Sequence, residues 1–134
     1  MRALVELTFP SEKKNIEQVE DCIDKFKEDL SICHQLLGKI RLAAVEAVTN
    51  AIEHGNHLDQ NKVVRFTAFQ YNSTLRLSIQ DQGNGFNPDE IPDPTSPELL
   101  LEPNGRGVFL MKRLADNIEF KDNGSCIEMD FKLS

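Results

Sequence analysis

The chain has 134 residues, of which 15 are basic and 22 are acidic, so its formal net charge is −7, and its 40% hydrophobic residues suffice for one compact core. The acidic balance argues against binding of nucleic acid through a broad basic surface, and no apolar run approaches the roughly 20 residues of a membrane span. Three cysteines at wide spacings predict neither a disulfide framework nor a zinc site.

The first part of the chain predicts a strand followed by two helices. Residues 3–9 alternate hydrophobic and polar side chains, which is the period of a half-buried strand. Hydrophobic residues then recur at every third or fourth position, which predicts an amphipathic helix with Ser11 as its N-cap. After a short break, a second helix is expected over about 32–54, and Gly55 would end it.

A hairpin and a long loop are expected next. Residues 63–71 and 75–81 have the composition of strands, and Asn72 and Ser73 between them predict an antiparallel pairing. Residues 83–104 hold five of the six prolines and follow no period. Because a loop of about this length is uncommon inside a compact domain and is usually functional or disordered, it is the first place to look for chemistry.

The end of the chain predicts a helix and a closing hairpin. The helix is expected over residues 107–115, and the hairpin pairs residues 118–120 with 127–133. Helices segregated from antiparallel hairpins predict an α+β fold. We therefore expect a two-layer sandwich, with a mixed, mostly antiparallel sheet covered by helices on one face.

Two polar side chains stand out in the second helix, which is otherwise small and apolar. Glu46 and Asn50 are four residues apart and share one helix face, with roughly 6 Å between their Cβ atoms. An amide oxygen can bind Mg²⁺ without adding charge, and a carboxylate can accept a proton from a hydroxyl. The alternative, which these two residues alone favour, is a solvent-facing Glu and an Asn tolerated near a helix end.

Asp81 continues the apolar face of the strand that precedes it. Its position is in register with Leu75, Leu77 and Ile79. Because an ionised carboxylate without a partner is costly to bury, we expect it to meet hydrogen-bond donors, such as the exocyclic amine of adenine. The alternative is an aspartate that caps the turn formed by Gly83 and Gly85.

Two glycine-rich segments bracket the proline-rich loop. The first contains Gly83 and Gly85, and the second contains Gly105, Arg106 and Gly107 just before the predicted helix. Glycine permits close approach of the backbone to a ligand, and the amides at a helix start favour phosphate. Each segment alone is a weak signal, since neither a Walker nor a Rossmann glycine pattern is present.

The order of these motifs resembles the GHKL ATPase superfamily. The segments Glu46-Ala-Val-Thr-Asn50-Ala-Ile-Glu-His54-Gly55, Asp81-Gln-Gly-Asn-Gly85-Phe86 and Gly105-Arg-Gly-Val-Phe-Leu-Met111 are similar to those of the anti-sigma-factor serine-protein kinases within it. The resemblance covers nearly the whole chain. It implies a single ATP-binding kinase domain over residues 1–134, with an ATP lid at about 86–104.

The resemblance also implies roles for the motif residues. Asn50 would hold Mg²⁺ at the phosphates, Glu46 would orient or deprotonate the attacking hydroxyl, and Asp81 would accept from the adenine amine. The remaining positions would shape the nucleotide pocket: Gly83 and Gly85 below the adenine, and Gly105, Arg106, Gly107 and Val108 around the phosphates.

The same resemblance implies what the protein does and what it binds. It would be a cytoplasmic, homodimeric anti-sigma factor that uses Mg²⁺ and ATP to phosphorylate a serine or threonine of an anti-sigma factor antagonist and that sequesters a sigma factor, without binding nucleic acid or membranes. A nucleotide-gated binding module without kinase activity is the alternative, and Glu46 favours the enzyme. An autophosphorylating histidine kinase, with His34 as acceptor, would need a separate helical hairpin for which the chain has no room.

Overall fold

The computed structural model describes residues 1–83 and 103–133, with the backbone alone at 103–106. Strands and helices follow in chain order as β1 (Arg2–Pro10), α1 (Ile16–Asp29), α2 (His34–Asn50), β2 (Val63–Tyr71), β3 (Thr74–Gln80), α4 (Pro103–Leu114), β4 (Asn117–Lys121) and β5 (Cys126–Lys132). Three short helical turns lie between them: η1 (Lys13–Asn15), η2 (Ala51–Gly55) and η4 (Asp122–Gly124).

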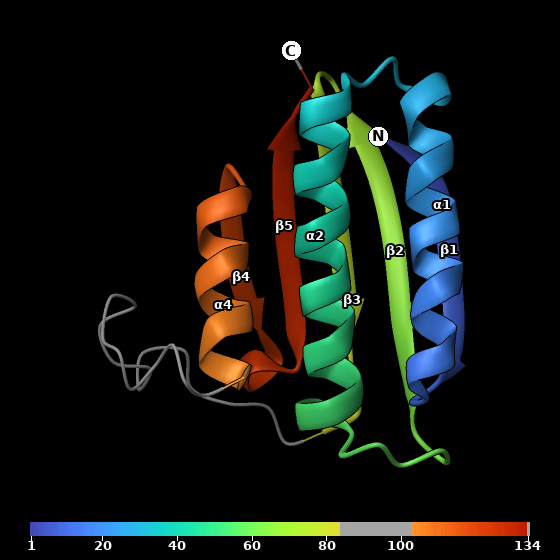
Figure 1. The fold of residues 1–134 in the computed structure, drawn as a ribbon, viewed down its shortest axis with the longest axis vertical. Coiled ribbons are helices and arrows are strands. Elements are labelled where there is room, and N and C mark those ends of the chain that lie inside the picture. Colours follow the sequence, from blue (N-terminus) through green and yellow to red (C-terminus); the bar gives the residue numbers. More distant parts are fainter. Residues whose placement is uncertain (84–102, 134) are drawn as a thin grey trace.

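The described residues form a two-layer sandwich. Five strands make one sheet of order β1-β2-β3-β5-β4, and all four neighbouring pairs are antiparallel. Helices α1, α2 and α4 lie side by side on one face of this sheet, with α2 in the middle (Figure 1). The predicted α+β sandwich and the predicted order of elements are both confirmed. The expected mixed sheet is wrong, because β2-β3 and β4-β5 are hairpins, which pair antiparallel, and the two remaining pairings of the described strands are antiparallel as well.

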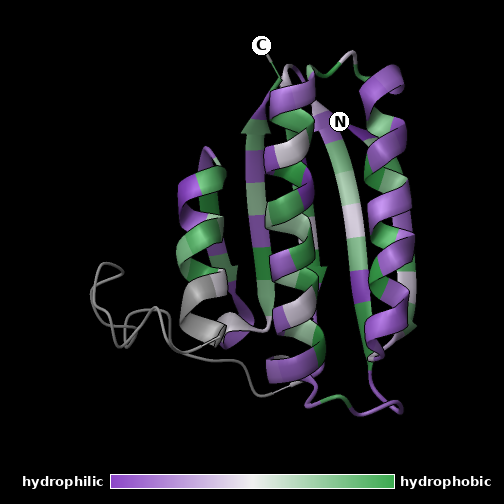
Figure 2. Cartoon of the chain, viewed as in Figure 1, coloured by the Kyte–Doolittle hydropathy of each residue, from purple (hydrophilic) through white to green (hydrophobic). Residues whose placement is uncertain are grey.

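The core lies between the sheet and the helices. Hydrophobic and hydrophilic residues alternate along the strands, as β5 shows clearly (Figure 2), so each strand offers one apolar face to the helices. From α2 the core receives Ala43, Ala44 and Ala47, all fully buried. Small side chains let α2 lie close to the strands, so these alanines serve packing against the sheet.

The predicted N-cap at Ser11 is wrong. Helix α1 begins at Ile16, after the turn η1, and no side chain caps η1. The Ser11 hydroxyl instead donates a 2.8 Å hydrogen bond to the carbonyl of Lys62, and Ser11 is only 1% exposed. A buried hydroxyl needs a partner, and the segment before β2 supplies one that sequence spacing does not reveal.

The second predicted helix is correct in extent but not regular to its end. Helix α2 runs to Asn50, and the chain continues in the π-helical turn η2 to Gly55. The amide of Asn56 donates to the carbonyl of Ala51 at 2.8 Å, which closes this wider turn. Such π-turns within helices are frequent at functional sites.

The last helix begins earlier than its sequence pattern indicates. Helix α4 starts at Pro103, so Gly105, Arg106 and Gly107 lie inside its first two turns and do not form a turn before it. Proline is favoured in the first turn of a helix, where its missing N–H is not needed. The predicted loop and lid therefore lose residues 103–104 to the helix, and their residues 84–102 lie outside the described part of the chain.

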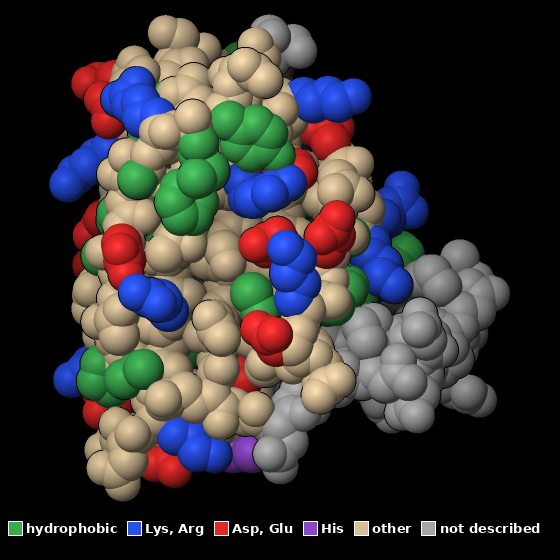
Figure 3. All heavy atoms as spheres, turned by 180° about the vertical axis from the view of Figure 1, so that it is seen from behind, with side chains coloured by type: hydrophobic (Ala, Val, Ile, Leu, Met, Phe, Trp, Pro, Cys, Tyr) green, Lys and Arg blue, Asp and Glu red, His purple; other side chains and the backbone are tan. Residues whose placement is uncertain are grey.

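Charged side chains pair across the uncovered face of the sheet (Figure 3). Arg76 forms two hydrogen bonds with Asp130 on the adjacent strand, at 2.7 and 3.0 Å. At one edge Arg65 binds Glu6 at 2.6 Å. This face carries charged side chains together with some hydrophobic ones (Figure 3), whereas the helix-covered face is apolar, as expected of an antiparallel sheet with one solvated side. Among the described residues, no helix has the length and apolarity that crossing a membrane would require.

Candidate functional site

Glu46 and Asn50 face the same point on α4. A Cβ atom built at Gly107 would lie 3.2 Å from Glu46 Oε2, 3.0 Å from Asn50 Nδ2 and 3.2 Å from Asn50 Oδ1. The two polar side chains therefore converge on the second turn of α4, where only a hydrogen atom occupies the position of a side chain. The shared helix face expected from their spacing is confirmed, and the contact with Gly107 adds a close backbone approach.

The amide of Asn50 lies buried without a complete set of partners. Asn50 is 7% exposed, and its Nδ2 has no hydrogen-bond partner among the described residues. Buried polar atoms are paired in the great majority of cases, so each exception calls for an explanation. Glu46 beside it is only half-buried. A polar ligand bound here could pair with the amide of Asn50, and the carboxylate of Glu46 beside it is accessible enough to contact the same ligand.

Asp81 lies directly after β3 and faces Gly55 at the end of η2. Its amide donates to the carbonyl of Ser125 at 2.9 Å, which continues the pairing beyond the strand. Its Oδ1 accepts the N–H of Gly83 at 2.8 Å. A Cβ atom at Gly55 would collide with this carboxylate, so Gly55 is required where η2 ends. The expected position on the helix-covered face is confirmed, and so is a cap on the turn at Gly83.

The carboxyl of Asp81 holds its proton more tightly than an ordinary aspartate. Burial raises its pKa, and the hydrogen bond from Gly83 together with the positive charges of Lys62 and His57 opposes that rise only in part. Burial therefore disfavours the ionised form, which accepts one hydrogen bond, from Gly83, among the described residues. A ligand with a hydrogen-bond donor would supply another.

Of the other expected site residues, the structure places Gly83 beside Asp81, whereas several others are not described or are described by their backbone alone. Gly83 lies against the carbonyl of Gly55. A Cβ atom built at Gly83 would collide with that carbonyl and would lie 3.1 Å from Asp81 Oδ1. Val108 is buried in the hydrophobic core. Gly85 lies outside the described residues, and Gly105 and Arg106 are described by their backbone in α4 alone.

Comparison with known proteins gives this arrangement a family. Residues 9–131 match the family described as the histidine kinase-like ATPase domain. The anti-sigma F factor of Clostridium perfringens is 32% identical over 135 residues, covering 96% of this chain and 95% of the relative. That of Bacillus thuringiensis is 33% identical over 129 residues, covering 93% and 87%. The chain belongs to the histidine kinase-like ATPase family.

Solved structures of this ATPase family share the fold. The structure of the RsbU and RsbW domains of a Mycobacterium tuberculosis protein matches 96% of this chain with a TM-score of 0.65 and 18% identity, and this chain covers 32% of it. The catalytic domain of the histidine kinase ThkA matches with a TM-score of 0.57 and 16% identity, over 96% of this chain and 97% of that domain.

Sequence reasoning on this histidine kinase-like ATPase missed the residues that support Asp81. Asn56 is fully buried and accepts the N–H of Gln82 through Oδ1 at 2.7 Å. Gln82 in turn accepts the N–H of Val63 at 2.7 Å through its side chain. Both residues are polar and lie in segments that have the composition of loops, and no local pattern indicates their distant partners.

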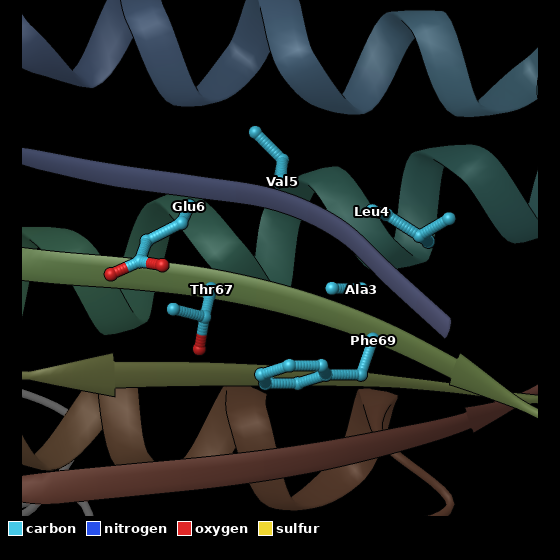
Figure 4. Close-up of a pocket in the computed structure, with 6 residues that line it drawn as sticks. All are labelled: Ala3, Leu4, Val5, Glu6, Thr67 and Phe69. Atoms are coloured by element: carbon cyan, nitrogen blue, oxygen red, sulfur yellow. The ribbon is translucent and has the colours of Figure 1, made fainter. Parts of the chain in front are cut away.

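The hollows that described residues line include one at strands β1 and β2 and one beyond the end of β3. One, of about 240 Å³, lies at an irregularity of β1 and is lined by residues of β1 and β2, including Glu6, Thr67 and Phe69 (Figure 4). The other, of about 430 Å³, lies at the end of the sheet and includes Arg65 and Asp81 in its lining. Only the second touches a residue of the candidate site, and neither contains Glu46 or Asn50.

Proposed function

We propose that this protein is an anti-sigma factor that uses Mg²⁺ and ATP to phosphorylate a serine or threonine of an anti-sigma factor antagonist. The observation that carries the proposal is the convergence of Glu46 and the buried, incompletely paired Asn50 on Gly107. Relatives named anti-sigma F factor, similar over nearly their full length, support the regulatory role.

The donor set fits a magnesium ion and a nucleotide. Asn50 offers an amide oxygen, a neutral ligand that hard cations accept, next to the carboxylate of Glu46. When bound, the ion neutralises charge on the phosphates. The close approach of Gly107 supports a role for α4 in phosphate binding, for which we propose Gly105, Arg106, Gly107 and the backbone of Val108.

Glu46 is the proposed catalytic residue. Its carboxylate is half-buried and lies beside Asn50, so it is placed to orient a substrate hydroxyl and accept its proton. Phosphoryl transfer asks little more of a protein than positioning and charge neutralisation. A module that only bound nucleotide would need Asn50 but not this carboxylate.

Asp81 is the proposed base-recognition residue. Its carboxylate is buried enough for its pKa to be raised and accepts one hydrogen bond, from Gly83, in the described residues; the exocyclic amine of adenine is a further donor that guanine lacks at the same position. Gly83 and Gly85 would form the floor of this pocket. The pairing explains why a half-buried carboxylate is retained despite the cost of its burial.

The partners follow from the names of the relatives. We propose that one cytoplasmic domain spanning residues 1–134, with a lid at about 86–104, binds a sigma factor and its antagonist as a homodimer. The amphipathic helix α1 offers one charged outer surface for such contacts, since Val19, Ile23 and Phe26 are buried in the core.

The test is phosphotransfer to a candidate antagonist. The wild type and Glu46→Ala would each be incubated with Mg²⁺, labelled ATP and the antagonist protein, and ATP affinity would be measured in parallel. The proposal predicts that Glu46→Ala loses label transfer and still binds ATP. Wild-type protein that binds ATP and partner without transferring label would instead identify a nucleotide-gated binding module.

A further inference from the structure

Asn56 connects four separate segments through one fully buried side chain. It is 0% exposed and follows the turn η2 directly. Its Nδ2 donates to Ser11 Oγ at 2.7 Å, after β1, and to the carbonyl of Val63 at 2.9 Å, at the start of β2. Its Oδ1 accepts the N–H of Gln82 at 2.7 Å, after β3. This amide therefore makes three of the four hydrogen bonds that a side-chain amide can make.

The donor side of Asn56 belongs to the scaffold. Ser11, which receives one of its hydrogen bonds, donates its own to the carbonyl of Lys62 at 2.8 Å. The backbone amide of Ser11 also donates to that carbonyl, at 3.1 Å. This side fixes the ends of β1 and β2 and holds the amide in one orientation. It contains no group of the candidate site.

The acceptor side of Asn56 belongs to the candidate site. Gln82 lies between Asp81, whose carboxylate faces Gly55, and Gly83, whose amide donates to that carboxylate. A hydrogen bond to the N–H of Gln82 thus fixes the peptide between Asp81 and Gln82, which is the backbone that bears the carboxylate. Since Gly55 immediately precedes Asn56, the same segment contacts the carboxylate and holds the backbone that bears it.

We infer that Asn56 is a positioning residue that sets the preference of this site for adenine over guanine. The inference rests on the proposed role of Asp81 as acceptor for the adenine amine. Asn56 touches neither nucleotide nor reacting atoms in this account. It fixes the backbone of the turn, so that the carboxylate stands where adenine presents a donor and guanine an acceptor.

The test compares two buried asparagines at the same end of the molecule. Asn56→Ala removes the bond to Gln82. Asn15→Ala is the matched control, because Asn15 is 7% exposed, donates to the carbonyl of Pro10 at 2.9 Å and accepts from Gln18 at 2.8 Å, but makes no hydrogen bond to the turn at Asp81. ATP and GTP affinities and thermal stability would be measured for the wild type and both variants.

The ratio of ATP affinity to GTP affinity distinguishes a positioning role of Asn56 from a purely structural one. Both variants are expected to unfold at lower temperature, but only Asn56→Ala should lose preference for ATP, by about tenfold, which corresponds to one hydrogen bond to a charged group. An Asn56→Ala protein that is folded and keeps the wild-type ratio overturns the inference. A wild type that binds ATP and GTP equally overturns the adenine assignment of Asp81 itself, and one that binds neither overturns the proposed function.

A second variant and a wild-type measurement cover the case in which Asn56→Ala does not fold. Asn56→Ser keeps a hydroxyl that can donate within the scaffold but is too short to replace the amide oxygen, so the same loss of preference is expected. In the wild type, amide hydrogen exchange at Gln82 should be slow, as in the adjacent strand. Exchange there at the rate of an open loop would refute the bond on which the inference depends.

Discussion

The contact between Gly55 and Asp81 gives the sharpest test of the site, because one methyl group would disrupt it. In Gly55→Ala, the new Cβ atom would lie 2.8 Å from Asp81 Oδ1 and closer still to Oδ2. The carboxylate must rotate away, and it then loses the N–H of Gly83. Gly38→Ala is the matched control, since Gly38 lies in the same helical segment with nothing within 4 Å of its Cβ position.

The expected changes in the free energy of unfolding follow from the loss of one hydrogen bond and from the higher helix propensity of alanine relative to glycine. A hydrogen bond to a charged group contributes about 1.5–3 kcal/mol, and alanine in place of glycine gains about 1 kcal/mol in a helix interior. Gly38→Ala should therefore raise the free energy of unfolding by up to about 1 kcal/mol, whereas Gly55→Ala should lower it by about 1 kcal/mol. Displacement of the Asp81 carboxylate should weaken ATP binding by about tenfold to a hundredfold.

Titration calorimetry with Mg²⁺ and ATP, together with chemical denaturation, measures both quantities on both variants. The account predicts opposite changes in stability, and a loss of ATP affinity in Gly55→Ala alone. A Gly55→Ala protein that binds ATP within about twofold of the wild type would refute the placement of Asp81 in the nucleotide site, since a shift this small is well below the loss of one charged hydrogen bond.

Three further predictions concern other contacts. Gly107→Ala places a methyl group 3.0 Å from Asn50 Nδ2 and should weaken ATP binding and phosphotransfer, at a stability cost of about 1 kcal/mol; unchanged binding by calorimetry would contradict the convergence on α4. Burial raises the pKa of Asp81 above its ordinary value of 3.8, so the folded state binds this proton more tightly than the unfolded state, and ionisation costs stability as pH rises through the folded pKa. Asp81→Asn should therefore raise stability at pH 7 while weakening ATP binding, and denaturation curves should show the gain disappearing below the ordinary pKa; a gain that grows on acidification would be the wrong sign. Arg76→Ala breaks a paired contact on the uncovered face and should cost about 0.5–1 kcal/mol, with ATP affinity unchanged; a loss of affinity would show that this face is linked to the site.

Local sequence patterns were sufficient for the fold and for one half of the site. Alternation in the strands and the spacing of Glu46 and Asn50 depend on neighbours within a few residues, so a one-dimensional pattern contains them. The position of Asp81 on the helix-covered face follows from the same alternation. These features are confirmed because one buried face per element decides them.

Contacts between distant segments could not be predicted in this way. The hydroxyl of Ser11 has the pattern of a helix cap, but its partner is 51 residues away in the chain. The glycines near the start of α4 look like a loop because residues 83–104 hold five prolines and follow no hydrophobic period, yet proline is well accommodated in a first turn. Asn56 carries no local signal of its role, since its three side-chain partners come from three other segments.

A crystal structure of the protein with Mg²⁺ and a non-hydrolysable ATP analogue tests the central claim most directly. The account predicts that the adenine amine donates to the carboxylate of Asp81 and that the ion binds the side-chain oxygen of Asn50, with Glu46 beside the terminal phosphate. Nucleotide bound elsewhere on the domain, or bound with Asn50 and Asp81 making no contact to it, would contradict the account.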